Sequence, residues 1–187
     1  MTRIDLPAPD ALTDTQQKVY QNILAGPRKT VRGGPLMLWL RSPELADLAQ
    51  RLGAFCRFQS SLSRRLSELA ILVSAAFWGA GYEWNSHAPA AAEAGIAPEV
   101  IEAIRSGATP AFAEADEELV YTFAVSLLRD HAVTADTWAR ARQHLSELQL
   151  VDLVGALGYY ALLSMTIKAF EIPPHDGDPD PFPPELS

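Results

Sequence analysis

The sequence predicts an all-α fold, a single-domain helical bundle, on three observations. Apolar residues recur with a period of about 3.6 along most of the chain, and no window sustains the alternation that is typical of strands. Capping boxes, prolines and glycines mark helix starts and ends between the apolar segments. A length of 187 residues and a hydrophobic content of 48% fit one domain with its own core.

We divide this single domain, residues 1–187, into a core and two polar ends. Residues 1–12 are an N-terminal extension, residues 13–172 the helical core and residues 173–187 a Pro-rich C-terminal tail. The tail is too polar to form a core of its own. We therefore expect either a disordered end or an arm laid across a neighbouring subunit.

The first part of the core contains two predicted helices. A capping-box pattern begins a helix over residues 13–24, which Gly26 ends. Residues 27–41 hold glycines and prolines in quick succession and predict an extended connection. Ser42 and Pro43 then begin a second helix with an apolar stripe of period 3.6. The stripe consists of Leu45, Leu48, Leu52 and Phe55.

The central pair of helices carries the candidate chemistry. Residues 66–78 are almost all apolar, which predicts a helix buried on most of its circumference, so the carboxylate of Glu68 is out of place there. Glycines at the interruption over residues 79–81 would let the next helix fold back. In that helix Glu83 and His87 stand four residues apart and share a face. We therefore expect Glu68 to approach Glu83 and His87.

Four more helices complete the bundle. They are predicted from Pro98 to Gly107, over residues 113–130, from about Thr134 with Trp138 and Leu145 as anchors, and over residues 147–170. The last is apolar on more than one face through residues 157–163, which is more than one neighbour in a small bundle would cover. A partner chain would bury the remainder.

The motif around these carboxylates carries a family resemblance. The run SELAIL, the YEW that follows, the histidine four residues after Glu83 and the pattern A-P-x-A-x-x-x-G together resemble the carboxymuconolactone decarboxylase family. The likeness extends over roughly residues 34–172, through the helix start at Ser42, the turn at residues 95–98 and the late Gly158-Tyr159-Tyr160. It implies the helical-bundle fold of the alkylhydroperoxidase D-like proteins.

The thiol chemistry of the alkylhydroperoxidase D branch has no counterpart at the motif. That branch carries a C-x-x-C pair, and Ala80 and Glu83 stand at the two positions here. A thiol peroxidase of this type needs a thiolate nucleophile and a resolving thiol. The sequence therefore resembles the decarboxylase-like branch.

The resemblance implies cofactor-free decarboxylation of a small carboxylated unsaturated lactone in aromatic catabolism. A histidine paired with a carboxylate is a general acid and base near neutral pH. By this resemblance His87 transfers the proton at carbon, Glu83 fixes its tautomer, and Glu68 is a proton reservoir behind them. Tyr82 and Trp84 would form the substrate pocket wall. We expect neither cofactor nor metal, although two carboxylates and an imidazole are a plausible ligand set.

Two other functions stay open. A hydroperoxide reductase of the alkylhydroperoxidase D type would have to use the single cysteine, Cys56, as a lone thiol, although a small buried residue is the simpler interpretation of it. A non-catalytic oligomeric binding protein would use Glu68, Glu83 and His87 as a structural polar cluster. An exposed i,i+4 pair would account for Glu83 and His87 alone.

Charge and composition restrict the partners. A net charge of -8 without a basic stripe argues against binding to nucleic acid. The most apolar window, residues 69–81, is shorter than the ~20 residues of a membrane span. The first residues lack the apolar core of a secretory signal, so we expect a cytoplasmic protein. The resemblance implies a cyclic homo-oligomer, a trimer or hexamer. A substrate carboxylate needs a cation, for which the sequence offers Arg32, Arg41, Arg57, Arg64 and Arg65.

Overall fold

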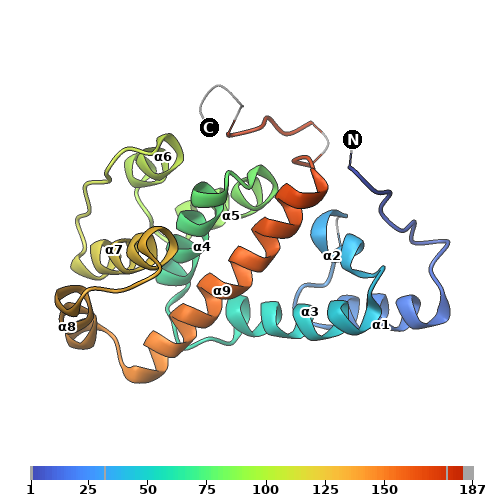
Figure 1. Ribbon diagram of the computed structural model, residues 1–187, viewed down its shortest axis with the longest axis horizontal. Helices are drawn as coiled ribbons and strands as arrows, with labels where there is room; N and C mark the ends of the chain where they lie inside the picture. The colour runs from blue at the N-terminus through green and yellow to red at the C-terminus, as the bar shows by residue number, and fades with distance from the viewer. Residues whose placement is uncertain (1, 32, 176, 183–187) are drawn as a thin grey trace.

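The computed structural model describes residues 2–31, 33–175 and 177–182, and all regular secondary structure in these ranges is helical, which confirms the all-α prediction (Figure 1). The helices are α1 (Asp14–Ala25), α2 (Gly34–Trp39), α3 (Pro43–Phe58), α4 (Arg64–Trp78), α5 (Gly81–Glu93), α6 (Pro98–Ser106), α7 (Ala115–Asp130), α8 (Ala135–His144) and α9 (Glu147–Phe170).

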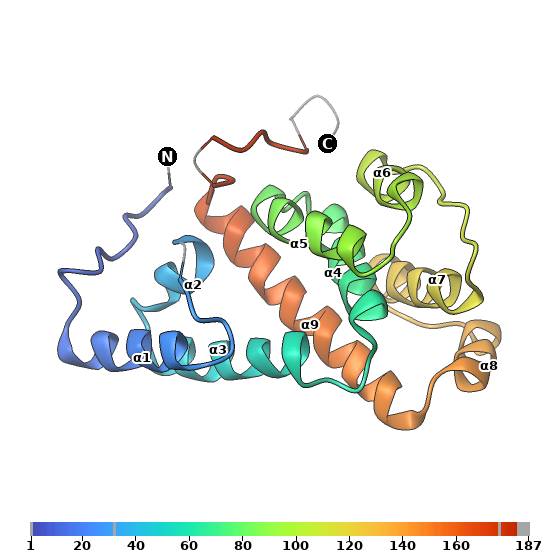
Figure 2. The same ribbon diagram turned by 180° about the vertical axis from the view of Figure 1, so that it is seen from behind.

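Helix α4 is the centre of the bundle and packs against α5, α7 and α9 (Figures 1 and 2). The Ser63 side chain accepts a hydrogen bond from the Leu66 amide and begins the helix. Every residue from Leu66 to Ala75 is buried, because neighbours cover the helix on all sides. The predicted burial of this helix on most of its circumference is confirmed.

The predicted turn between α4 and α5 is also present. Gly79 ends α4 in the left-handed region, with φ 59°, and the Ala80 amide donates to the Ala75 carbonyl over 2.8 Å. A residue without Cβ adopts this conformation at little cost, which explains glycine at the position. The chain then reverses, and α5 packs along α4.

The extended connection predicted over residues 27–41 was wrong in its second half. The chain forms the short helix α2 there, with Pro35 in the first turn and positive φ at both Gly33 and Gly34. The apolar run buries Met37, Leu38 and Trp39, and the Trp39 indole donates to Thr166 on α9 over 3.1 Å. The glycine and proline cluster therefore marks a helix start.

The remaining helices follow their sequence signals closely. The capping boxes at Thr13 and Ser146 begin α1 and α9 as predicted. One anchor was wrong: Trp138 on α8 is 47% exposed, whereas Leu145 is buried. Helix α9 is long and apolar enough to cross a membrane by length and composition, but 61% of its apolar window is buried inside the molecule, as in a core helix.

The described part of the tail lies against its own chain. We call residues 173–175 and 177–182 the C-terminal strap; residues 183–187 lie outside the described ranges. Asn85 on α5 donates to the Pro179 carbonyl over 2.9 Å, and Arg105 on α6 donates to the Pro181 carbonyl over 3.0 Å. The strap therefore crosses α5 and reaches α6 (Figure 2).

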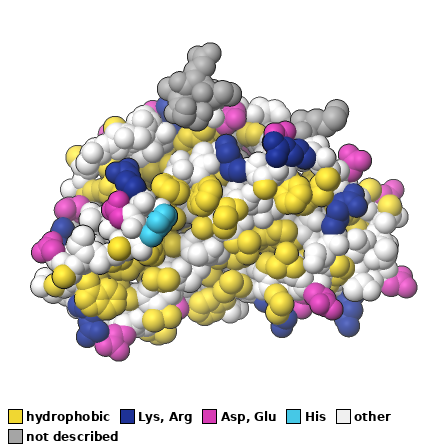
Figure 3. All heavy atoms as spheres, in the orientation of Figure 1, with side chains coloured by type: hydrophobic (Ala, Val, Ile, Leu, Met, Phe, Trp, Pro, Cys, Tyr) yellow, Lys and Arg dark blue, Asp and Glu magenta, His cyan; other side chains and the backbone are white. Residues whose placement is uncertain are grey.

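An apolar surface stays uncovered on α3 and α9, but not where the sequence suggested. Residues 157–163 are mostly buried within the chain. Instead the exposed face of α9 carries no charged side chain between Leu148 and Met165, and the predicted stripe of α3 also faces solvent. The two helices pack side by side, and hydrophobic side chains gather on this face (Figure 3). We call it the α3/α9 face.

We expect the protein to self-associate through the α3/α9 face. Leu48 and Val151 are 62% and 69% exposed, so a glutamate at either position is tolerated in a monomer but would bury an unpaired charge in an interface. In size-exclusion chromatography with light scattering, the double variant Leu48→Glu/Val151→Glu should have the mass of one chain, 20.4 kDa. The wild type and the control variant Gln143→Glu should have a mass that is a multiple of the mass of one chain. A monomeric wild type would contradict this prediction.

Candidate active site

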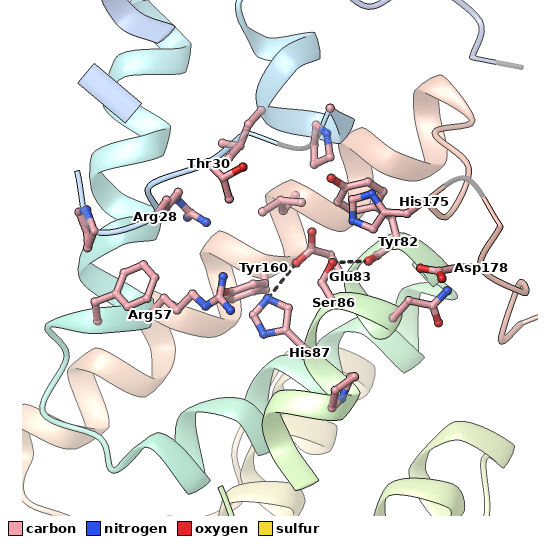
Figure 4. A pocket seen from close by; sticks show the side chains of 18 residues that line it. Arg28, Thr30, Arg57, Tyr82, Glu83, Ser86, His87, Tyr160, His175 and Asp178 are labelled. Atoms are coloured by element: carbon pink, nitrogen blue, oxygen red, sulfur yellow. Dashed lines mark hydrogen bonds and ion pairs between the residues drawn. The ribbon is translucent and has the colours of Figure 1, made fainter. Parts of the chain in front are cut away.

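The structure brings together the three acid and base residues that the sequence singled out. Glu68 comes from α4, and Glu83 and His87 come from α5. Glu68 Oε2 lies 2.6 Å from His87 Nδ1, and Glu83 Oε2 lies 3.4 Å from His87 Nε2. Each of these side chains is at most 6% exposed. The imidazole is therefore held between two buried carboxylates, one of which is drawn in Figure 4.

Electrostatics in this buried cluster favour the charged imidazole. Burial lowers the pKa of His87, but hydrogen bonds to Glu68 and Glu83, together with their charges, outweigh burial and raise the pKa above its ordinary value near 6.5. The ring also meets the edge of Tyr160, with ring centroids 5.2 Å apart. His87 is thus a proton carrier that is charged to a higher pH than a free histidine.

The two carboxylates occupy different places, and the arrangement differs from the expected one. We expected Glu83 to fix the tautomer of the imidazole, yet the short contact belongs to Glu68. A cavity of about 560 Å³ opens beside the cluster, lined by Glu83 and His87 but not by Glu68. Glu68 therefore holds Nδ1 from behind, and Glu83 faces the cavity with Nε2 (Figure 4).

The cavity gathers side chains from distant parts of the sequence. It is bounded by the segment before α2, the start of α2, the end of α3, α5, α9 and the C-terminal strap. Both apolar and polar groups line it, which suits a small ligand with polar substituents. The lining includes Pro35, Leu36, Phe58, Tyr82, Ser86, Tyr160, Leu163, His175 and Asp178.

Two arginines supply positive charge at one end of the cavity. Of the arginines that the sequence offered, Arg57 lines the cavity, and Arg32 lies outside the described residues. The others engage elsewhere: Arg41 donates to the Asp5 carbonyl, Arg64 pairs with Glu93, and Arg65 pairs with Asp116 and Glu117. Arg28 also lines the cavity, and sequence reasoning missed it because it lies outside any helical pattern.

The two predicted wall residues have different outcomes. Tyr82 lines the cavity, where its ring lies 4.2 Å from that of His175 on the strap. Trp84 does not: it is 4% exposed, packs in the core and meets Phe182 edge-on. The prediction that Trp84 forms the pocket wall was wrong, because one residue along a helix rotates a side chain by about 100° away from Glu83.

Cys56 lies apart from this site. It is 1% exposed and does not line the cavity. Burial, with a contribution from the charge of Asp152, raises the pKa of its thiol to about 11. Both ring nitrogens of His87 face carboxylates, and within the described ranges no group of three acidic, histidine or cysteine side chains has the geometry of a metal site.

Comparisons with known proteins agree with the fold and the motif. The model of the carboxymuconolactone decarboxylase family matches residues 43–124, a region that holds Glu68, Glu83 and His87. The resemblance that the sequence shows is therefore confirmed. Among solved structures, an uncharacterized peroxidase-related protein from Silicibacter sp. TM1040 has the same fold, with a TM-score of 0.75, 18% identity and 95% of each chain covered. No curated protein matches the chain.

The raised pKa of His87 predicts a pH-dependent contribution to stability. A group whose pKa is higher in the folded state stabilises fully below its unfolded value, about 6.5, and loses this contribution as pH rises through the folded value. Urea unfolding of wild type and His87→Gln should therefore give a free-energy difference that shrinks towards alkaline pH. The exposed His144→Gln is the control, and a difference independent of pH would contradict the prediction.

Proposed function

We propose that this chain of the carboxymuconolactone decarboxylase family is an acid/base enzyme that decarboxylates a small carboxylated lactone or a related carbonyl compound. One observation carries the proposal: a buried imidazole, held by Glu68 from behind, opens with Glu83 onto a cavity that has two arginines. Perturbed, desolvated proton carriers beside a cavity are typical of catalytic sites.

The reaction needs one proton delivered to carbon. When the bond to the departing carboxylate breaks, CO2 leaves and the electron pair spreads through the adjacent double bond towards the lactone carbonyl. The resulting carbanion equivalent takes up one proton, so each turnover consumes a proton. A charged His87 is a suitable donor because its pKa is raised by its two carboxylate partners.

The geometry supports distinct tasks for the two glutamates. After Nε2 gives up its proton, Nδ1 keeps its own because it remains hydrogen-bonded to Glu68, which fixes a single tautomer. Glu83 contacts Nε2 over a longer 3.4 Å and lines the cavity. These contacts support Glu83 as the group that passes a proton between His87 and the substrate, and Glu68 as a positioning residue that acts through His87.

Turnover of γ-carboxymuconolactone tests the proposal. General acid and base catalysis contributes about 10²- to 10⁴-fold in rate, so His87→Gln and Glu83→Gln should lower kcat by that order. CO2 release and loss of the substrate's ultraviolet absorbance are the measurements, with His144→Gln as the control. Turnover that persists in His87→Gln would exclude the assigned role. A folded wild type without turnover would exclude this substrate.

A hydroperoxide reductase is the alternative function within the same fold, and this activity would depend on the single cysteine. The buried, high-pKa thiol of Cys56 is a poor nucleophile at neutral pH, since the thiolate is the reactive form. With cumene hydroperoxide and dithiothreitol, wild type and Cys56→Ser should therefore consume peroxide no faster than buffer. Peroxide consumption that disappears in Cys56→Ser would instead favour the reductase.

A non-catalytic binding protein makes a different prediction from both enzymes. In such a protein the three residues would only stabilise the core, so His87→Gln would lower the melting temperature and no substrate would turn over. Loss of turnover in a variant that melts close to the wild type would count against it. The same preparations serve for both measurements.

A further inference from the structure

We infer that Arg28 is the anion-binding residue of the cavity, seated there by Tyr159 and by the missing side chain of Gly53. The binding of an anion at Arg28 is independent of which reaction takes place.

Arg28 has no counter-charge among the described residues. No carboxylate in those ranges lies at salt-bridge distance from it, whereas Arg65 has two. Its Nη2 donates to the Tyr159 hydroxyl over 3.3 Å, and its Nε is buried without any acceptor. An unmet buried donor on a charged group is unfavourable. An anion in the cavity would supply the missing counter-charge to the guanidinium.

Gly53 provides the space for this arrangement. It lies inside α3, where glycine is less favourable than alanine. Its φ is not positive, so the backbone itself does not require glycine there. A Cβ at this position would overlap the Tyr159 hydroxyl and lie 2.5 Å from Arg28 Nη2. The glycine is therefore explained by the close approach of these two side chains.

Tyr159 positions Arg28 without neutralising it. The side chain is 2% exposed, and burial raises the pKa of its hydroxyl well above the ordinary value. The hydroxyl is thus neutral at physiological pH and accepts from Arg28 as a dipole. The positive charge of Arg28 remains available to a ligand, and Arg57 lies at the same end of the cavity (Figure 4).

Binding of phthalate, a planar dicarboxylate, tests the anion site apart from turnover. Calorimetry at low ionic strength should show phthalate binding to the wild type and none for phthalamide, its uncharged analogue. Arg28→Gln should weaken phthalate binding by about tenfold or more. Arg51→Gln, on the exposed side of the same region and paired with Asp47, is the matched control and should bind as the wild type does.

Gly53→Ala tests the seating, because Gly53 does not line the cavity. The alanine variant should weaken phthalate binding as Arg28→Gln does. If the alanine variant does not fold, phthalate binding by Arg28→Gln alone still tests the anion site. Unchanged binding in folded Arg28→Gln, or no phthalate binding by the wild type, would overturn the anion site. His87→Gln should still bind phthalate, so loss of turnover there with retained binding separates the two proposals.

Discussion

The contact between Glu68 and His87 is the constraint on which the rest of the site depends. It joins α4 to α5 at 2.6 Å, and both side chains are almost fully buried. Removing ionisable groups from water costs several kcal/mol per ion unless partners compensate. The cluster is therefore stable only while α4 and α5 stay in register, and the turn at Gly79 fixes that register.

Buried ionic clusters contribute little to the free energy of folding, since apolar side chains of similar volume often stabilise the core as well or better. The proposed function accounts for the presence of this cluster beside a cavity. The cluster is asymmetric: one carboxylate is enclosed behind the imidazole, and the other borders the cavity. Such an arrangement lets the ring change its proton on one side while its orientation is held from the other.

The sequence could predict the elements and the cluster because both depend on local signals. Caps and glycines fixed the helix ends, and an i,i+4 pair placed Glu83 and His87 on one face. Other features depend on tertiary packing. The segment around Arg28 has no period from which a direction could be inferred, and the position of Trp84 follows from which face of α5 meets the core. The α2 helix is too short for periodicity to reveal.

Glycines shape the cavity as much as the side chains that line it. A Cβ on Gly53 would displace Tyr159 and Arg28, one on Gly34 would overlap the ring of Tyr82, and one on Gly81 would press against the C-terminal strap. Each glycine lies where two distant segments approach closely, and the lack of a side chain there leaves room for the contact. Sequence patterns are read from the side chains present. The walls of this cavity therefore could not be predicted from the sequence, because they depend on how the helices pack against one another.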